Sequence, residues 1–266
     1  MRRLRQLMTA VVVAMTGISF IVLAAIFNGT PGDDTITGGP ENDVIKGFAG
    51  DDVLNGGDGN DFIDGGLHDD MIIGGNGADK IYGGDGNDII CGGSLSSGQC
   101  TTDTNGNDTI FGGRGDDMID GGPGHDRIEG GPGDDTLVGG TGNDFINGGT
   151  GDDTIDGGGG HDTLIGGPGD DQITGGDGDD IIDPGQGLDQ VDAGKGNDTI
   201  IIRPGDVPGF QTEIIDCGEG NDTVLLYGFP RGIQLPGTGT NAPVTITDPI
   251  SRGTYLLINC ETIARR

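Results

Sequence analysis

Aspartate recurs in this chain at intervals of nine residues, and each copy follows a glycine-rich stretch, as in GGTGDDTID at residues 148–156. Carboxylates at a fixed spacing beside flexible backbone can bind cations, because the carboxylates supply charge and the glycines allow backbone carbonyls to turn toward the same ion. The candidate ligands are Asp34, Asp43, Asp52, Asp61, Asp70, Asp79, Asp88, Asp108, Asp117, Asp126, Asp135, Asp144, Asp153, Asp162, Asp171, Asp180, Asp189 and Asp198.

The repeating unit is GGxGxDxUx, in which U is aliphatic and positions are numbered one to nine. Position eight is Ile, Leu or Val in every unit from Ile36 to Ile200, and one more copy of the pattern surrounds Asp222. Position four is glycine except at Glu41 and His68, which indicates a backbone conformation or a close approach that a Cβ would obstruct. Position five is mostly Asp or Asn, residues that tolerate left-handed conformations.

A period of nine suits neither a helix nor an ordinary strand. Each unit divides into a glycine-rich turn of six residues and an extended piece of three, which is too short to be stable alone. If two units form one coil, stacked coils make two parallel sheets with facing aliphatic columns, and the turns fall on two opposite edges. The sequence therefore predicts an all-β fold, a parallel β-solenoid.

The nonapeptide resembles the repeats of the RTX, or hemolysin-type calcium-binding, family from Gly29 to about Ile201. This resemblance implies a parallel β-roll that binds many Ca²⁺ ions. It also implies that position-six aspartates of turns 18 residues apart share an ion with carbonyls of the GGxG segment. The 18 aspartates named above are the residues to which the resemblance assigns this role.

Oxygen ligands in a flexible, carbonyl-rich turn suit Ca²⁺, whereas Mg²⁺, the alternative metal, demands near-octahedral geometry and retains its waters. One ion between next-but-one units gives roughly 16 ions, whose charge would offset the formal net charge of −31. A single aliphatic residue per unit makes a thin interior, and stacked carboxylates repel one another. We therefore expect the metal-free chain to be largely unfolded and calcium binding to drive folding.

The composition excludes several classes of protein. Of 266 residues, 60 are Gly and none is Trp, so a conventional globular core is not expected. With 44 acidic and 13 basic side chains, the chain would repel nucleic acid and anionic membrane surfaces. High charge with low hydrophobicity is also typical of disorder, but disorder predicts no strict spacing.

The N-terminus predicts export. Arg2, Arg3 and Arg5 precede an uncharged apolar run from Leu7 to Phe27, which is typical of a signal peptide. We favour cleavage near Ala24, although the run is also long enough to remain as an uncleaved membrane anchor over residues 1–27. Under both interpretations the chain from residue 28 onward lies outside the cytoplasm.

The four cysteines agree with an extracellular location, where disulfides persist. We predict the pairs Cys91–Cys100 and Cys217–Cys260, because each would close a segment that lacks the repeat. A zinc site is the alternative, but the spacings contain no CxxC pair.

We predict three parts: the N-terminal segment 1–27, the β-roll 28–201 with a disulfide-closed insertion at 94–106, and a β-rich cap at 202–266 that carries one degenerate repeat. The cap would cover the open sheet edge. His125 and His161, both at position five, are interpreted as replacements for Asn or Asp in exposed turns rather than as a metal pair.

The sequence contains no GxSxG and no HExxH motif, so we expect no enzymatic activity. We predict a secreted or cell-surface calcium-binding protein with a structural or adhesive role. The alternative is an extracellular module whose solenoid face binds a polysaccharide or a protein, which a patch of outward aromatic or basic residues would favour. Positions seven and nine show no such stripe along the sequence, nor the regular threonine array that ice binding would need.

Overall fold

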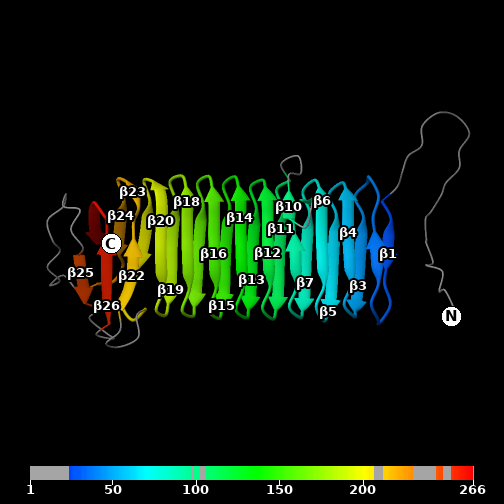
Figure 1. Cartoon of the computed structure of the whole chain (residues 1–266), viewed down its shortest axis with the longest axis horizontal. Coiled ribbons are helices and arrows are strands. Elements are labelled where there is room, and N and C mark those ends of the chain that lie inside the picture. The colour runs from blue at the N-terminus through cyan, green and yellow to red at the C-terminus, as the bar shows by residue number, and fades with distance from the viewer. Residues whose placement is uncertain are drawn as a thin grey trace, which may run out of the picture.

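The computed structural model describes residues 24–96, 99–101, 106–206, 212–229, 244–247 and 253–265. These residues form strands and no helix, and accordingly no helix among them could cross a membrane. The strands stack along one long axis into an elongated roll (Figure 1). The prediction of an all-β parallel β-roll is confirmed.

Two long sheets make up the roll. Sheet A consists, in spatial order, of β1 (Ile26–Asn28), β3 (Val44–Ala49), β5 (Phe62–Leu67), β7 (Lys80–Asp85), β11 (Thr109–Arg114), β13 (Arg127–Pro132), β15 (Phe145–Thr150), β17 (Thr163–Pro168), β19 (Ile181–Gln186), β21 (Thr199–Ile202), β24 (Thr223–Leu226) and β27 (Thr262–Arg265). Sheet B consists of β2 (Thr35–Thr37), β4 (Val53–Asp58), β6 (Met71–Asn76), β8 (Ile89–Cys91), β12 (Met118–Pro123), β14 (Thr136–Thr141), β16 (Thr154–Gly159), β18 (Gln172–Asp177), β20 (Gln190–Gly196), β22 (Thr212–Asp216), β26 (Thr254–Ile258) and β25 (Val244–Thr247), with β23 (Glu219–Gly220) also paired to β20.

Consecutive strands alternate between the sheets, so each strand pairs in parallel with the strand one coil away. In β15 and β17, for example, Ile146 lies beside Leu164, 18 residues later. We call the turns that lead from sheet A to sheet B the AB edge and those that lead back the BA edge. Two repeats therefore build one coil, with one turn on each edge.

The regular strands have six residues, from position seven to position three of the next repeat, rather than the three expected from the sequence. Pairing continues through the glycines, as between Gly131 and Gly149. A Cβ on Gly149, which has φ of 118°, would lie 1.9 Å from the carbonyl oxygen of Gly131. Glycine therefore permits the coils to approach closely enough to extend the ladder.

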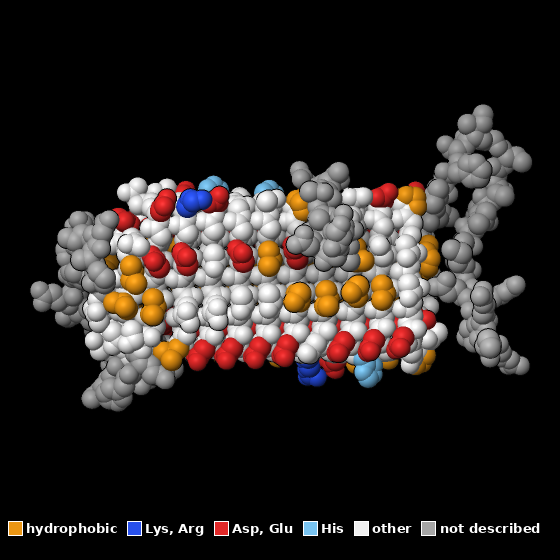
Figure 2. Space-filling model, in the orientation of Figure 1, with side chains coloured by type: hydrophobic (Ala, Val, Ile, Leu, Met, Phe, Trp, Pro, Cys, Tyr) orange, Lys and Arg blue, Asp and Glu red, His pale blue; other side chains and the backbone are white. Residues whose placement is uncertain are grey.

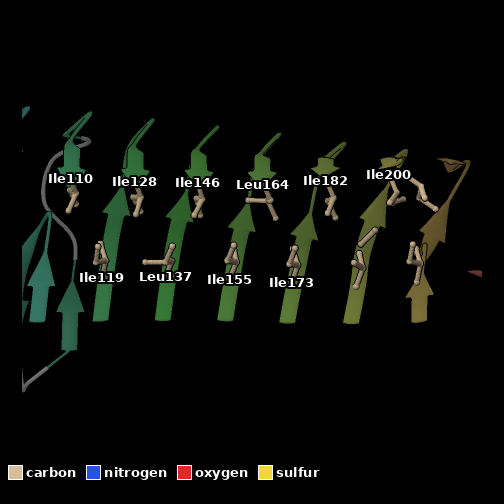
Figure 3. Close-up of a cluster of buried hydrophobic side chains, with 14 of the residues drawn as sticks. Ile110, Ile119, Ile128, Leu137, Ile146, Ile155, Leu164, Ile173, Ile182 and Ile200 are labelled. Carbon is tan, nitrogen blue, oxygen red and sulfur yellow. The ribbon is translucent and has the colours of Figure 1, made fainter. Parts of the chain in front are cut away.

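The position-eight side chains of the two sheets point toward one another and form the core (Figure 3). Ile128, Ile146 and Leu164 from sheet A face Leu137 and Ile155 from sheet B, and each of these side chains is at most 1% exposed. Each regular repeat thus contributes one aliphatic side chain to the interior, which is as narrow as the sequence predicts.

The regular stacking extends beyond both ends of the region predicted from the repeat. Phe27 on β1 pairs with Ile45 and packs against the core. Both sheets also continue through β21 to β27, and β25 adds antiparallel to β26. The predicted signal or anchor falls largely on residues 1–23, which lie outside the described residues.

The insertion occupies a single turn of the BA edge. Its described strands β9 (Ser94–Ser96) and β10 (Gln99–Thr101) form an antiparallel hairpin. The coil resumes in register, because Ile110 pairs with Ile81 and Asp79 donates its N–H to Asp108, 29 residues later. An insertion in a turn therefore leaves the stacking of the sheets intact.

Candidate metal centre

The structure arranges the 18 predicted aspartates in two files, one along each edge. The AB edge carries Asp34, Asp52, Asp70, Asp88, Asp117, Asp135, Asp153, Asp171 and Asp189. The BA edge carries Asp43, Asp61, Asp79, Asp108, Asp126, Asp144, Asp162, Asp180 and Asp198. All except the partly exposed Asp34 are at most 3% exposed.

From Asp43 onward, one oxygen of each of these carboxylates accepts a hydrogen bond from the preceding coil. The N–H of Asp135, for example, donates to Oδ1 of Asp153 at 2.9 Å, and the N–H of Asp153 donates to Oδ1 of Asp171 at the same distance. This bond repeats along both files and orients each side chain along the edge. Oδ1 therefore links consecutive coils by accepting this hydrogen bond, in addition to carrying charge.

The second oxygen, Oδ2, is buried in most of these turns and has no hydrogen-bond donor among the described residues. This holds for Asp52, Asp61, Asp70, Asp88, Asp117, Asp135, Asp144, Asp153, Asp162, Asp171, Asp180, Asp189 and Asp198. A buried carboxylate oxygen without a partner is costly. Its repetition at the same position in successive coils indicates that a ligand outside the polypeptide completes the site.

A second oxygen converges on the same region, and position-one glycine leaves the space for it. At Gly148, the place a Cβ would take is 2.3 Å from Oδ2 of Asp153 and 2.8 Å from the carbonyl oxygen of Gly166 in the next coil. Gly130 and Gly166 have the same surroundings. Carboxylate and carbonyl oxygens in a glycine-lined cradle are the ligands that Ca²⁺ prefers, so these turns fit calcium.

No group of three or more His, Cys, Asp or Glu side chains arranged to hold a metal ion occurs in the described part of the chain. Side chains alone therefore do not form a cage. Each turn would have to combine its carboxylates with backbone carbonyls, as the resemblance implies.

Burial changes the acidity of the files. It raises the pKa of Asp70, Asp153 and Asp162 to about 7, against a usual value of 3.8, because desolvation penalises the charged form and the neighbouring aspartates add repulsion. The N–H donated by the preceding coil opposes this rise only in part. A divalent cation would reverse the balance by stabilising the carboxylates as anions.

The first two turns differ from those that follow. Thr30 donates its backbone N–H and its hydroxyl to Oδ2 of Asp34, the latter at 2.9 Å. Gly39 donates its N–H to Oδ2 of Asp43 at 2.7 Å. Oδ2 of these two carboxylates therefore has a hydrogen-bond donor within its own turn. A cation is less necessary there than in the turns that follow.

The last turns differ at position one. This position is glycine in every repeat from Gly29 to Gly175. It is then occupied, in order along the chain, by Pro184, Ala193, Ile202, Cys217 and Leu226. In the glycine turns a space lies between Oδ2 of the position-six aspartate and a carbonyl oxygen of the next coil. A Cβ at position one fills this space.

Sequence reasoning missed Glu213 as a member of the AB file. Because Gln190 pairs with Ile214, Glu213 lies opposite Asp189 at position six. It is 2% exposed, and its Oε2 has no donor among the described residues. Burial, with the charges of Asp189 and Asp206, raises the pKa of Glu213 to about 9. Counting back nine residues from Asp222 would have identified it.

Position five forms an outer ladder beside each file. The Nδ1 atoms of His125 and His161 accept the N–H groups of Asn143 at 2.7 Å and Asp179 at 2.8 Å. Asn107 accepts the N–H of His125 in the same way. The two histidines are exposed and act in place of Asn or Asp, as interpreted from the sequence.

On the AB edge, the position-five side chains include a row of exposed acids that lies along one margin of the roll in Figure 2. These carboxylates also accept N–H groups from the next coil, as Asp134 does from Asp152 at 2.9 Å. They therefore contribute to the ladder rather than to the buried files.

One predicted disulfide is confirmed, between Cys217 and Cys260, with a Cα–Cα distance of 5.2 Å. It joins consecutive coils at the BA edge. The other predicted pair, Cys91–Cys100, includes a side chain outside the described residues and stays a prediction.

Comparison with known proteins agrees with the geometry. No curated protein matches the chain significantly. The profile of the family described as RTX calcium-binding nonapeptide repeat (4 copies) matches residues 28–63, 64–95, 102–137, 129–164, 156–191 and 165–200. These matches span more than half of the chain, and the chain belongs to the RTX calcium-binding nonapeptide repeat family.

Proposed function

We propose that this calcium-binding repeat protein is an extracellular structural or adhesive protein whose roll folds when the position-six aspartates bind Ca²⁺. The observation that carries the proposal is the file of buried Oδ2 atoms without donors, which in the glycine turns lie close to a carbonyl oxygen of the next coil. The aspartates from Asp52 to Asp180, whose turns have glycine at position one, are the ligands proposed with the strongest support, whereas Oδ2 of Asp34 and of Asp43 already accepts a hydrogen bond within its own turn.

Calcium would supply cohesion that the apolar interior lacks. The glycine coils bury one aliphatic side chain per repeat, and glycine loses more backbone freedom on folding than any other residue. Charged carboxylates stacked at the roughly 4.8 Å spacing of adjacent strands would repel one another strongly. An ion between coils removes this repulsion and links consecutive turns at once.

An extracellular location is supported by the Cys217–Cys260 disulfide and by the charged and apolar pattern of the N-terminus. Calcium concentrations outside cells suit the weak sites of extracellular modules, with dissociation constants of about 10⁻⁴–10⁻³ M. The proposed sequence of events is export in the unfolded state, followed by folding where calcium is abundant.

Circular dichroism of the purified protein tests the proposal. We expect the strand signal to be small in EDTA, to rise cooperatively in millimolar CaCl₂, and to rise far less in the same concentration of MgCl₂. Equal strand content in EDTA and in calcium would refute calcium-driven folding. Fractionation of the producing cells tests location separately, and retention of the folded protein in the cytoplasm would refute the extracellular role.

A further inference from the structure

The outer surface of sheet A between β3 and β15 concentrates aromatic and basic side chains. We call it the aromatic–basic face. Its outward positions seven and nine carry Lys46, Phe62, Lys80, Tyr82, Phe111, Arg127 and Phe145. The expectation that positions seven and nine lack such a stripe is therefore wrong. Alternate repeats belong to different sheets, so the pattern is visible only when every second repeat is read.

The outer surface of sheet B is different in kind. From β2 to β20 its outward positions seven and nine carry no Lys or Arg, and they include Asp120, Asp156 and Asp192. This surface faces the viewer in Figure 2, where basic side chains lie only at its margins. Of the outward positions seven and nine on the strands from β2 to β20, only those of sheet A therefore carry Lys or Arg.

The aromatic and basic side chains contact one another within strands and across neighbouring strands. The rings of Tyr82 and Phe111 are stacked with centroids 5.0 Å apart. Lys80 lies 5.2 Å from the ring centroid of Tyr82, and Arg127 lies 4.5 Å from that of Phe145. These contacts rest the cations on apolar rings while their charge still faces water.

The cations of this face are only partly neutralised. Lys46 lies 3.4 Å from Asp64, and the side chains of this pair are each 39% exposed. Such an exposed pair contributes little stability and can exchange partners. Among the described residues Lys80 has no ion-pair partner. Three cations therefore meet two acids, Asp64 and Glu129, on the outward strand positions, so this face is locally cationic.

Strained, exposed apolar residues lie where this face meets the AB edge. Phe48 has φ of 82°, a conformation costly for a bulky side chain, yet it is 50% exposed. Leu67 in the next coil is 49% exposed, and the adjacent His68 has φ of 78°. Burial does not explain these side chains. The positive φ itself belongs to the repeat, because Gly66 at the position of Phe48 and Gly86 at the position of His68 also have it. The exposed apolar side chains extend the aromatic–basic face to this edge.

We propose that the aromatic–basic face binds an anionic polysaccharide whose sugar rings carry carboxylates. Half-buried aromatic side chains offer apolar surface to sugar rings, and Lys46, Lys80 and Arg127 offer partners for the carboxylates. The same side-chain types recur on successive strands, roughly 4.8 Å apart along the roll axis, so a polymer of similar units can lie along the roll. The inference rests on the proposed function, because calcium must first neutralise the files.

Hyaluronate oligosaccharides are the probe, titrated calorimetrically into the calcium-loaded protein. We expect binding to weaken at least about tenfold in the variant Lys46→Gln/Lys80→Gln/Arg127→Gln, and to weaken also in Tyr82→Ala. The matched control is Gln172→Ala/Gln190→Ala on the outer surface of sheet B, which should bind like the parent protein. Dextran oligosaccharides of equal length, which carry no charge, should bind more weakly than hyaluronate.

The proposal is overturned if hyaluronate does not bind, if dextran or poly(U) RNA binds equally well, or if the sheet B control weakens binding as much as the sheet A variants. Circular dichroism in CaCl₂ should be the same for all variants. Failure of calcium-driven folding is recognised separately, because it appears in the parent protein without any polysaccharide.

Discussion

Between β3 and β18 position one of every repeat is glycine, whereas from β19 onward it is Pro184, Ala193, Ile202, Cys217 or Leu226. In the glycine coils the space beside this position lies between a buried carboxylate oxygen and a carbonyl of the next coil. In the last coils the same space holds apolar side chains, and Ile202 and Leu226 are buried in the core.

The two regions therefore obtain cohesion by different means. The glycine coils bury one aliphatic side chain per repeat and leave space for a cation beside their buried carboxylates. The last coils widen the apolar core, where Phe229, Tyr255 and Leu257 join the position-eight residues. Cys217, which stands where a glycine cradle would be, is bonded to Cys260 in the next coil. A covalent bond thus links these two consecutive coils.

Removing calcium should separate the regions most clearly. In EDTA we expect backbone amides from β3 to β18 to lose protection from hydrogen exchange by several orders of magnitude, because their carboxylates repel one another. Amides of β22, β24 and β26 should retain more protection, since apolar packing and a disulfide hold them. Uniform loss over the whole chain, measured by mass spectrometry, would contradict the comparison.

Protonation of the position-six carboxylates at low pH should replace part of the stabilisation that calcium provides. Burial raises the pKa of Asp117 and Asp153 to about 7, above the usual 3.8, so the metal-free folded state binds more protons than the unfolded state between these values. Its stability is therefore full below about pH 4 and is lost as the pH rises to about 7. Circular dichroism in EDTA should show more strand at pH 4 than at pH 8.

With calcium present the pH dependence should reverse. Protons compete with the ion for the carboxylates, so the apparent calcium affinity should fall as the pH is lowered from about 8 to 5. Calcium titrations at several pH values measure this. An affinity independent of pH would mean that the position-six carboxylates are not the ligands.

Removing the disulfide should affect the last coils. The Cys217–Cys260 bridge spans 43 residues, and its loss in Cys217→Ser/Cys260→Ser should lower the free energy of unfolding by about 2–4 kcal/mol. Urea titration in saturating calcium measures the loss. The number of bound calcium ions should stay unchanged, and a smaller number would show that the bridge supports the glycine coils as well.

Substitution of single carboxylates should distinguish turns that have glycine at position one from turns that have another residue there. Asp153→Asn retains an oxygen that can accept the N–H of Asp135 but removes the charge beside Gly148. We expect it to bind about one calcium ion fewer. Asp198→Asn, in the turn that carries Ala193, serves as the matched variant and should lower the number less, because the Cβ of Ala193 narrows the space beside the Asp198 carboxylate. Equal losses in the two variants, measured by equilibrium dialysis with metal analysis, would show that position one does not control binding.

The smallest changes in calcium binding should come from substitutions at position one itself. In Gly148→Ala the new methyl group would lie 2.3 Å from Oδ2 of Asp153, so the carboxylate must move and the site should bind calcium more weakly. Overpacking of this kind costs about 1–3 kcal/mol. The reciprocal change, Ala193→Gly, should add calcium affinity beside Asp198. Metal analysis after dialysis against limiting calcium compares the two variants.

Much of the site could be predicted from the sequence, because its pattern is local and periodic. The strict nine-residue spacing of Asp135, Asp144 and Asp153 predicted the coil, the two edges and the aspartate files. The sequence could not show that Thr30 satisfies Asp34. The nine-residue spacing from Asp222 indicates Glu213, but only the pairing of β20 with β22 places it opposite Asp189 in the AB file. These relations depend on which turn each residue enters.

The sequence by itself determined the coil length, the inward aliphatic column and the choice of a hard cation, since these follow from residue types at fixed spacing. Only the tertiary structure decided which neighbours meet. Tyr82 and Phe111 are 29 residues apart in sequence yet stack because both lie on sheet A, beyond an insertion that a turn absorbs. Contacts across coils depend on register, and register is fixed by the packing of the whole roll.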